Sequence, residues 1–468
     1  MSILRKQKYR NGIKIIGFIV AAAGILAIIF PVFNYKDMGG GGGFQRFYES
    51  PSNSMDVMFF GSSRAHCTID HGYLWDHYGI SGFTLSAGSQ KLDSTYYCVQ
   101  EALRWQKPKA IFVEVSQVNN GVIENGEIDV YRNYLGMKLS KTSLSFANYF
   151  GRQMNMSHEE KEELYTRFPI IHSRYRELER ADFIDEIPFM RGYRGSFEVV
   201  SFDTPAVTEQ TMEISQDNQE FIQKIILLSK EKNVPLVLFA SPYVVSEEEQ
   251  MRINAVGEIA RENDIPFINF NRLYEETGID FSCDFRDSSH VNNAGAQKVT
   301  EYLAQYIKAN YETEDHRGDN KYILWDQNAK YLHNKELHHE LEQAEDINDY
   351  LAQLPKDEKD VILIQFVGNY QALGDVYLEN IMKTGLSEED YICGGYYFLC
   401  DGSKIEKTED ISIDENQVIW IQGEAYQTEI ENGVNVVVYD KELKQIIDIA
   451  GDDVYLGLTM SHFDLKEQ

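Results

Sequence analysis

The sequence predicts an α/β protein whose larger domain is a parallel sheet with helices on both faces. Between residues 55 and 311, short apolar segments alternate with longer segments of helical periodicity. The apolar segments are continuous runs, which is typical of strands that are buried on both faces. Small and polar turn residues follow several of these runs. Together these observations favour a three-layer α/β domain, and the chain of 468 residues has room for more than one domain.

The amino-terminal segment is predicted to anchor the chain in a membrane. Residues 1–14 carry five basic side chains and no acidic one, and Ile15–Phe33 carries no charge. The apolar segment is long enough to span a bilayer, and the basic flank favours a cytoplasmic tail. A cleaved signal peptide is the alternative, but its apolar region would be shorter. We therefore expect a single-pass cell-membrane protein whose bulk is extracytoplasmic.

Residues 34–54 are predicted to be a flexible linker. They contain the unbroken glycine run Gly39–Gly43, and glycine-rich segments behave as flexible coils. The folded part is therefore expected to begin near Ser54.

Five strands and five helices are predicted in the larger domain. The predicted strands are Val57–Phe60, Gly82–Ser86, Ala110–Val115, Val234–Phe239 and Pro266–Phe270. The predicted helices are Thr68–Tyr78, Asp93–Arg104, Asn218–Lys230, Glu247–Glu262 and Val291–Asn310. Ligands of such sheets bind at the carboxyl ends of the strands, where Ser63, Gly88 and Ser241 are located.

An insertion at residues 119–205 interrupts this alternation. It is rich in arginine and tyrosine, and we expect it to be mostly helical and to lie over the strand ends. Most of these side chains are expected to face solvent, and a few could contact an acidic or sugar substrate.

Residues 312–468 are predicted to form a separate α+β domain, because the charged segment 312–320 has no regular pattern. Its predicted strands are Val361–Val367, Tyr396–Leu399, Gln417–Ile421, Val434–Tyr439 and Gln445–Ile449. Its predicted helices are Ile347–Leu354 and Ala372–Thr384. No catalytic group of residues is evident there, and the adjacent His338 and His339 are expected at the surface.

Charge and cysteine content exclude several classes of function. The formal net charge of −30 argues against nucleic acid as a partner, because phosphate backbones need a Lys/Arg surface. The five cysteines have no metal-binding spacing and are too few for a disulfide framework. We expect no metal and no cofactor.

Two motifs carry the predicted chemistry. An apolar strand ends in Gly61-Ser62-Ser63, and Asp287 lies three residues before His290 at the start of a helix. A serine needs a base to become a nucleophile near neutral pH, and the base needs a group that fixes its tautomer. Ser63, His290 and Asp287 are predicted to take these three roles.

Two other residues could take part in the same chemistry. Asp284 is an alternative orienting acid, although the spacing of Asp287 fits better. His66 is an alternative base, but it lies one helical turn after Ser63 and is expected to point away from the hydroxyl.

Residues 55–311 resemble the SGNH/GDSL hydrolase family. Gly61-Ser62-Ser63 is similar to the family's first block, with Ser63 at the nucleophile and Ser62 at the usual aspartate. Ala87-Gly88-Ser89 resembles the second block, and Asp287–His290 matches the Asp-x-x-His block. The resemblance implies an SGNH-like three-layer fold and an oxyanion hole that includes the amides of Ser63 and Gly88.

The variant Gly-Ser-Ser-Arg with a membrane anchor resembles one subgroup of that family. This subgroup includes the D-alanine transfer protein of teichoic-acid modification and the polysaccharide O-acetylation partners of membrane-bound O-acyltransferases. The resemblance implies an acylated polysaccharide or cell-envelope polymer as substrate and a membrane-bound O-acyltransferase as partner.

The chain departs from the family pattern after the third strand, where a Gly-x-Asn-Asp motif is absent. That asparagine normally completes the oxyanion hole, and Gln90 or Asn119 would have to replace it. We expect a serine acyl-ester hydrolase or O-acyltransferase that works through an acyl-serine intermediate. The alternative is a catalytically weak binding partner of a glycan or of a membrane-bound O-acyltransferase.

Overall fold

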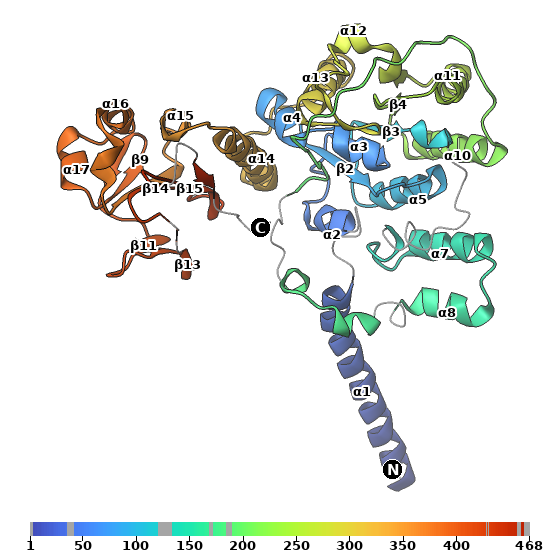
Figure 1. The fold of residues 1–468 in the computed structure, drawn as a ribbon. Helices are drawn as coiled ribbons and strands as arrows, with labels where there is room; N and C mark the ends of the chain where they lie inside the picture. Colours follow the sequence, from blue (N-terminus) through green and yellow to red (C-terminus); the bar gives the residue numbers. More distant parts are fainter. Residues whose placement is uncertain are drawn as a thin grey trace. The chain divides into compact units, whose positions relative to one another are not determined.

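A five-stranded parallel sheet forms the centre of the first part of the chain in this computed structural model (Figure 1). The strand order is β2-β1-β3-β4-β5, and every pairing is parallel. The strands are β1 (Val57–Gly61), β2 (Gly82–Ser86), β3 (Ala110–Glu114), β4 (Leu236–Ala240) and β5 (Phe267–Asn269). All residues of β1 to β4 are buried, as the continuous apolar runs predict.

The structure describes residues 3–34, 42–119, 133–167, 172–183, 190–426, 428, 430–455 and 460–462. These residues form two compact units that divide between Asp326 and Gln327. The division lies further along the chain than the predicted boundary at residue 311.

Helices lie on both sides of the sheet, with α4 and α13 together on one side and α5 and α10 on the other (Figure 1). The helices of this region are α3 (Ser63–Thr68), α4 (His71–Tyr78), α5 (Leu92–Ala102), α10 (Gln216–Lys232), α11 (Glu247–Glu262), α12 (Tyr274–Thr277) and α13 (Asn293–Asn310). The helix predicted at Thr68–Tyr78 is confirmed as α4, but its predicted start is wrong, because α3 ends at Thr68 and α4 begins at His71. Asp70 stands between them and accepts the amide protons of Gly72 and Tyr73, which starts a new helix.

The predicted linker is wrong over residues 42–54. Gly42–Glu49 forms helix α2, in which Phe44 and Phe47 are buried. The ring of Phe47 lies 5.8 Å from that of Phe83 in β2. Two buried aromatic rings stabilise this helix against the sheet, so the folded unit begins before Ser54. Gly39 to Gly41 lie outside the described residues.

The helices and 3₁₀ turns that the structure describes in the insertion lie before residue 183. They include α7 (Lys141–Gln153), α8 (His158–Thr166) and the 3₁₀ turns η2 (His172–Arg176) and η3 (Arg180–Asp182). Residues 190–215, all of which are described, form neither helix nor strand. Arg194 donates its amide proton to the carbonyl of His66 at 2.7 Å, and Val200 donates to that of Phe285 at 2.8 Å. This extended stretch therefore passes alongside the segments that carry both predicted motifs.

The second unit contains a six-stranded sheet in the order β10-β9-β8-β14-β15-β16 and a three-stranded sheet in the order β11-β12-β13. The strands of the larger sheet are β8 (Asp360–Val367), β9 (Tyr396–Cys400), β10 (Ser403–Ile405), β14 (Gly433–Asp440), β15 (Gln445–Asp453) and β16 (Ser461–His462). Those of the smaller sheet are β11 (Ile411–Ile413), β12 (Ile419–Ile421) and β13 (Glu424–Tyr426). The helices are α14 (Ile323–Glu342), α15 (Ile347–Gln353), α16 (Asp375–Lys383) and α17 (Glu388–Cys393), and α14 crosses the division between the units.

A buried carboxylate in β15 connects three parts of the second unit. Asp448 is fully buried, and the hydroxyl of Tyr350 donates to it at 2.6 Å. Nδ1 of His338 lies 3.1 Å from its Oδ1, and Nδ1 of His462 lies 3.5 Å from its Oδ2. The bond to Asp448 raises the pKa of His338. The prediction that His338 is a surface residue is therefore wrong, since it is half-buried against an acid.

All five cysteines lie within the described residues and are free thiols. Cys67 and Cys98 are buried in the first unit, and burial raises the pKa of the Cys67 thiol to about 11. Cys283 and Cys393 are exposed, and Cys400 is intermediate.

The amino-terminal helix α1 (Ile3–Phe33) contains an apolar stretch, Asn11–Phe30, that is long enough to cross a membrane. Its large apolar side chains between Ile13 and Ile28 are exposed. A signal sequence near the amino terminus can meet the same criteria of length and composition.

The two alternatives for α1 differ in an accessible measurement. If α1 is a membrane anchor, the protein should remain in the membrane fraction, and protease added to intact cells should digest the region after Asn34. A soluble form whose sequence begins shortly after residue 33 would instead identify α1 as a cleaved signal peptide.

Candidate functional site

The first motif forms a tight turn between β1 and α3. Gly61 has φ of +154°, and a Cβ built on it would lie only 2.6 Å from Cβ of Glu114 in the neighbouring strand, so a side chain is excluded there. Ser62 is the N-cap of α3, and its Oγ accepts the amide proton of Arg64 at 3.3 Å. Ser63 is the first residue of α3. The turn thus places the Ser63 side chain at the carboxyl end of β1.

The second motif forms a short two-stranded hairpin before α13. Its strands are β6 (Phe285–Asp287) and β7 (His290–Val291), and Asp287 pairs with His290. Oδ1 of Asp287 accepts the amide proton of Ser289 at 2.7 Å, which fixes the carboxylate inside its own turn. Asn292 then caps α13 through the amide of Gly295. The hairpin and the capped helix set the position of the imidazole.

The two motifs meet. Nε2 of His290 lies 2.7 Å from Oγ of Ser63. Nδ1 of His290 lies 2.9 Å from Oδ2 and 3.0 Å from Oδ1 of Asp287. A carboxylate only accepts hydrogen bonds, so Nδ1 carries the proton and Nε2 is left to accept the proton of the Ser63 hydroxyl. The predicted geometry of the three side chains is confirmed, whereas their catalytic roles remain predictions.

The protonation of this group suits a general base. Burial lowers the pKa of His290, and Asp287 opposes that effect only in part. Burial acts to raise the pKa of Asp287, but the bonds from His290 and from the amide of Ser289 outweigh it, so the net pKa is lowered. Near neutral pH the imidazole is neutral and the carboxylate is charged. These are the states that proton abstraction from Ser63 requires.

The three side chains are accessible to solvent. The side chain of His290 is 17% exposed and that of Asp287 is 47% exposed, and Ser63 is partly exposed.

The two alternative residues have other partners. Oδ2 of Asp284 lies 2.6 Å from Nζ of Lys298 and accepts the amide proton of Asp280 at 2.7 Å. Nδ1 of His66 lies 2.9 Å from Oγ of Ser86 at the end of β2. Neither Asp284 as orienting acid nor His66 as base is supported by these contacts.

Of the predicted oxyanion donors, Gly88 lies near the nucleophile turn and Gln90 is bonded elsewhere. Gly88 lies two residues beyond Ser86, which pairs with Gly61, so the second loop lies beside the nucleophile turn. The prediction that Gln90 belongs to the oxyanion hole is wrong. Gln90 is fully buried, its Nε2 donates to Thr95 at 2.9 Å, and its Oε1 accepts from Asn133 at 2.8 Å. Its carboxamide is thus bonded inside the core.

The other residue considered for this role, Asn119, also has a partner. Its Nδ2 donates to the hydroxyl of Tyr243 at 3.1 Å. The ring of Tyr243 in turn lies 3.7 Å from the guanidinium carbon of Arg64. Neither side chain considered for the third oxyanion position is therefore aimed at Ser63 in this structure.

Sequence reasoning missed Glu114, which is fully buried at the end of β3. The hydroxyl of Ser62 donates to its Oε2 at 3.4 Å, and the amide of Ser116 donates to its Oε1 at 2.9 Å. A signal was present, because an acidic residue inside an apolar strand needs buried partners.

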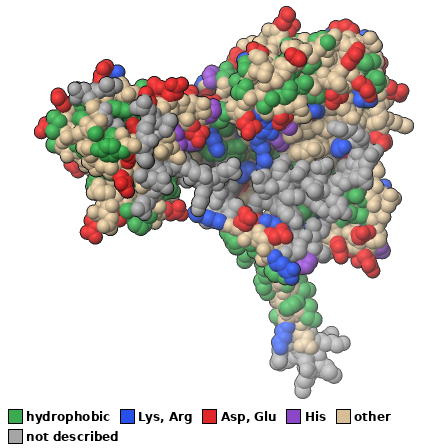
Figure 2. All heavy atoms as spheres, viewed as in Figure 1, with side chains coloured by type: hydrophobic (Ala, Val, Ile, Leu, Met, Phe, Trp, Pro, Cys, Tyr) green, Lys and Arg blue, Asp and Glu red, His purple; other side chains and the backbone are tan. Residues whose placement is uncertain are grey.

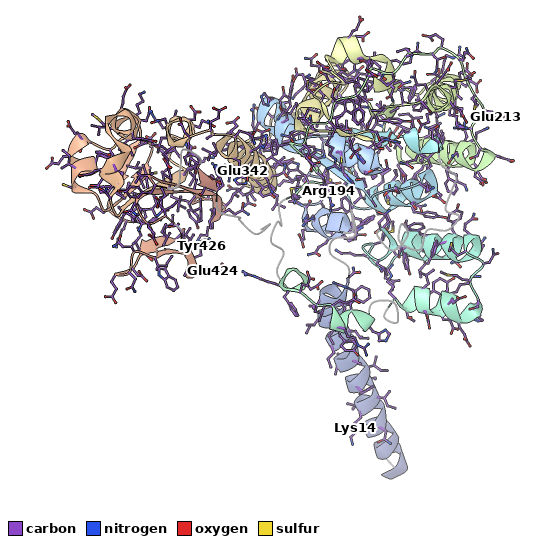
Figure 3. All side chains as sticks on the ribbon, viewed as in Figure 1. Lys14, Arg194, Glu213, Glu342, Glu424 and Tyr426 are labelled. Atoms are coloured by element: carbon purple, nitrogen blue, oxygen red, sulfur yellow. The ribbon has the colours of Figure 1, made fainter. Side chains whose placement is uncertain are left out.

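Basic side chains stand near these motifs in a chain of strongly negative charge. Nε of Arg286 lies 3.5 Å from Oδ2 of Asp287. Arg194 comes from the extended stretch that bonds to α3 (Figure 3). Acidic side chains are spread over the visible surfaces of both units in Figure 2. The basic groups beside the triad therefore differ in sign from most of the charged surface.

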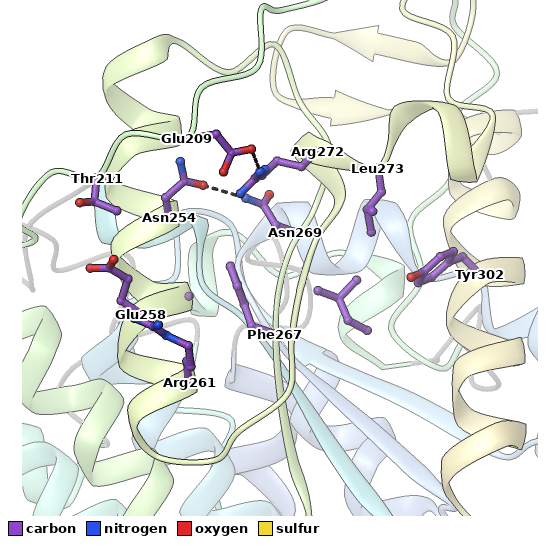
Figure 4. A pocket seen from close by; sticks show the side chains of 12 residues that line it. Glu209, Thr211, Asn254, Glu258, Arg261, Phe267, Asn269, Arg272, Leu273 and Tyr302 are labelled. Carbon is purple, nitrogen blue, oxygen red and sulfur yellow. Dashed lines mark hydrogen bonds and ion pairs between the residues drawn. The ribbon is translucent and has the colours of Figure 1, made fainter.

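A pocket of about 680 Å³ lies elsewhere in the first unit, at the edge formed by β5 and α11 (Figure 4). Its lining includes an ion pair between Arg272 and Glu209 and a bond from Asn269 to Asn254 at 3.4 Å. None of its lining residues belongs to the triad, and the chemistry of Ser63 and His290 is a stronger guide to function than the size of this hollow.

Within the part of the chain that the structure describes, no group of three or more His, Cys, Asp or Glu residues could hold a metal ion.

Searches against protein-family models and against curated proteins found no match to this chain. Any assignment of function therefore depends on the site itself.

Proposed function

We propose that this protein is a membrane-anchored, extracytoplasmic serine acyl-ester hydrolase or O-acyltransferase with an SGNH-like domain. Its substrate would be an acylated cell-surface or exported polysaccharide. The observation that carries the proposal is the arrangement of Ser63, His290 and Asp287, with hydrogen-bond distances of 2.7 to 3.0 Å between atoms of adjacent members. Ser63 lies 227 residues from His290, so their contact is a product of the fold and not of closeness in sequence.

The proposed reaction proceeds in two steps. Nε2 of His290 takes the proton of Ser63 as Oγ attacks the ester carbonyl, and the amides of Ser63 and Gly88 stabilise the oxyanion. The tetrahedral intermediate collapses when His290 gives its proton to the leaving sugar hydroxyl, which leaves an acyl-Ser63. Water or an acceptor hydroxyl then loses its proton to His290 and attacks the acyl group, which regenerates Ser63.

A second function is favoured by the contacts of Gln90 and Asn119. Both amides have other partners, so neither supplies the third oxyanion donor in this structure. The loss of one donor lowers rates by about 10²–10³-fold. The second candidate is therefore a catalytically weak binding partner of a glycan or of a membrane-bound O-acyltransferase.

Covalent labelling distinguishes the two functions. The full-length protein, treated with a fluorophosphonate, should acquire one adduct that peptide mapping places on Ser63. Ser63→Ala should abolish labelling, and His290→Ala should slow it greatly, whereas Ser201→Ala, at an exposed serine of the extended stretch, should label normally.

Two other results would change the proposal. Absence of labelling and of ester hydrolysis, together with full function of Ser63→Ala in cells, would identify a binding partner. Labelling at Ser63 without hydrolysis would identify a transferase that requires its own acceptor.

A further inference from the structure

Glu114 lies directly beneath the nucleophile turn. It is fully buried at the carboxyl end of β3, next to β1, and its Cβ lies against Gly61. Its carboxylate accepts the hydroxyl of Ser62 and the amide of Ser116. Burying a carboxylate costs free energy unless its oxygens are hydrogen-bonded and its charge is balanced, so Glu114 requires a nearby positive charge.

Arg64, the residue that follows Ser63 in the chain, supplies the opposite charge. Its Nη1 donates to Oγ of Ser116 at 3.0 Å, so Glu114 and Arg64 share Ser116 as a partner. Its guanidinium packs on the ring of Tyr243, and the hydroxyl of Ser241 donates to its carbonyl at 3.4 Å. Burial raises the pKa of Glu114, and Arg64 opposes this effect. The side chain of Arg64 is thus held by Ser116 and Tyr243, and its backbone carbonyl is held by Ser241.

These contacts involve both chain neighbours of the nucleophile, Ser62 and Arg64. Ser62 donates to Glu114 and accepts from the amide of Arg64, so one hydroxyl joins the acid to the first turn of α3. We propose that Glu114 and Arg64 are positioning residues for the reaction: they fix the turn that presents Ser63, and they balance each other's charge beside His290. This inference rests on the proposed function for its kinetic consequences, but the charge balance can be measured separately.

The charge balance has a definite sign. At Nδ1, His290 bonds to Asp287, which pairs with Arg286. At Nε2 it bonds to Ser63, which is followed in the chain by Arg64 and preceded by Ser62, the residue that donates to Glu114. A positive charge disfavours the imidazolium, and a negative charge favours it. Loss of the Glu114 charge should therefore lower the pKa of His290, and loss of the Arg64 charge should raise it.

The test is the pH profile of kcat/KM for an aryl acetate, measured on the full-length protein and three variants. Glu114→Gln keeps the size of the side chain and should move the acid limb to lower pH by about 0.5–1 unit. Arg64→Met should move it to higher pH by a similar amount, and the double variant should return it close to that of the wild type. Both single variants should lower kcat about tenfold or more with little change in KM, because positioning acts on the reacting hydroxyl.

Glu101→Gln is the matched control. Glu101 is also fully buried and accepts bonds from Tyr48, Arg104 and Trp105, but it lies in α5. It should lower stability without moving the acid limb. A purely structural role for Glu114 would give this same result, and an unmoved limb in Glu114→Gln would overturn the charge balance.

An independent readout separates this inference from the proposed function. Histidine-selective ¹³C NMR reports the titration of His290, identified among the 11 histidines by His290→Gln, whether or not the protein hydrolyses esters. If no ester is hydrolysed but the His290 titration moves as described, the proposed function fails and the charge balance stands. If neither single variant moves that titration, the inference fails, and Arg64→Met still decides the matter should Glu114→Gln not fold.

Discussion

Replacement of Ser63 by alanine should reduce kcat/KM for a short aryl ester by about 10³–10⁶-fold. The hydroxyl is the only atom that the change removes, and it lies 2.7 Å from Nε2 of His290. His290→Ala should cause a loss of similar size, because the serine is then left without a base. The double variant should be no worse than either single one, since the two residues act as a unit.

Two controls make this result specific. Ser63→Ala should unfold at nearly the wild-type temperature, because Ser63 is partly exposed and caps nothing. Asp287→Asn should keep a small residual activity, because the imidazole still samples the required tautomer. Equal activity of wild type and Ser63→Ala would remove Ser63 from the mechanism.

Replacement of Asp448 by alanine should destabilise the second unit by about 3–5 kcal/mol, the usual cost of removing one partner from a buried charge cluster. The change leaves His338, His462 and the hydroxyl of Tyr350 without their common acceptor. Calorimetry should show the transition of this unit at a temperature lower by on the order of 10 °C.

The matched control for that variant is Glu415→Ala, at an exposed position of the same unit. It should leave both transitions in place, because exposed charges contribute little to stability. Ester hydrolysis, which depends on residues of the first unit, should persist in Asp448→Ala at a temperature below both transitions. Unchanged melting of Asp448→Ala would show that the cluster does not hold the second unit together.

The sequence predicted the central sheet well, because burial on both faces leaves a strong pattern. The strand Gly82–Ser86 and the helix Glu247–Glu262 have the predicted bounds, and the latter is fixed by the cap at Ser246. Failures occurred where a local interaction outweighed the pattern. Asp70 caps α4 and so moves the start of the predicted helix from Thr68 to His71. Phe44 and Phe47 pack a segment whose glycine content indicated a coil.

The site was predictable to the extent that its chemistry is local. Asp287 and His290 share one turn, so their spacing was sufficient to pair them. The contact of Glu114 with Ser62 depends on the side-by-side placement of β1 and β3, and spacing along the chain gives no information about that placement. The prediction for Gln90 failed for the same reason, since its bond to Asn133 joins residues that are far apart in sequence.

The five free thiols have a consequence for where this chain can mature. The described fold of each unit is complete without a covalent cross-link, so its assembly does not depend on an oxidising compartment or on thiol exchange catalysts. Cys67 and Cys98 are buried, and the raised pKa of each thiol keeps the nucleophilic thiolate scarce, which protects both from oxidation. Folding of either unit therefore requires no disulfide, whereas the thiols of Cys283 and Cys393 remain exposed to oxidants.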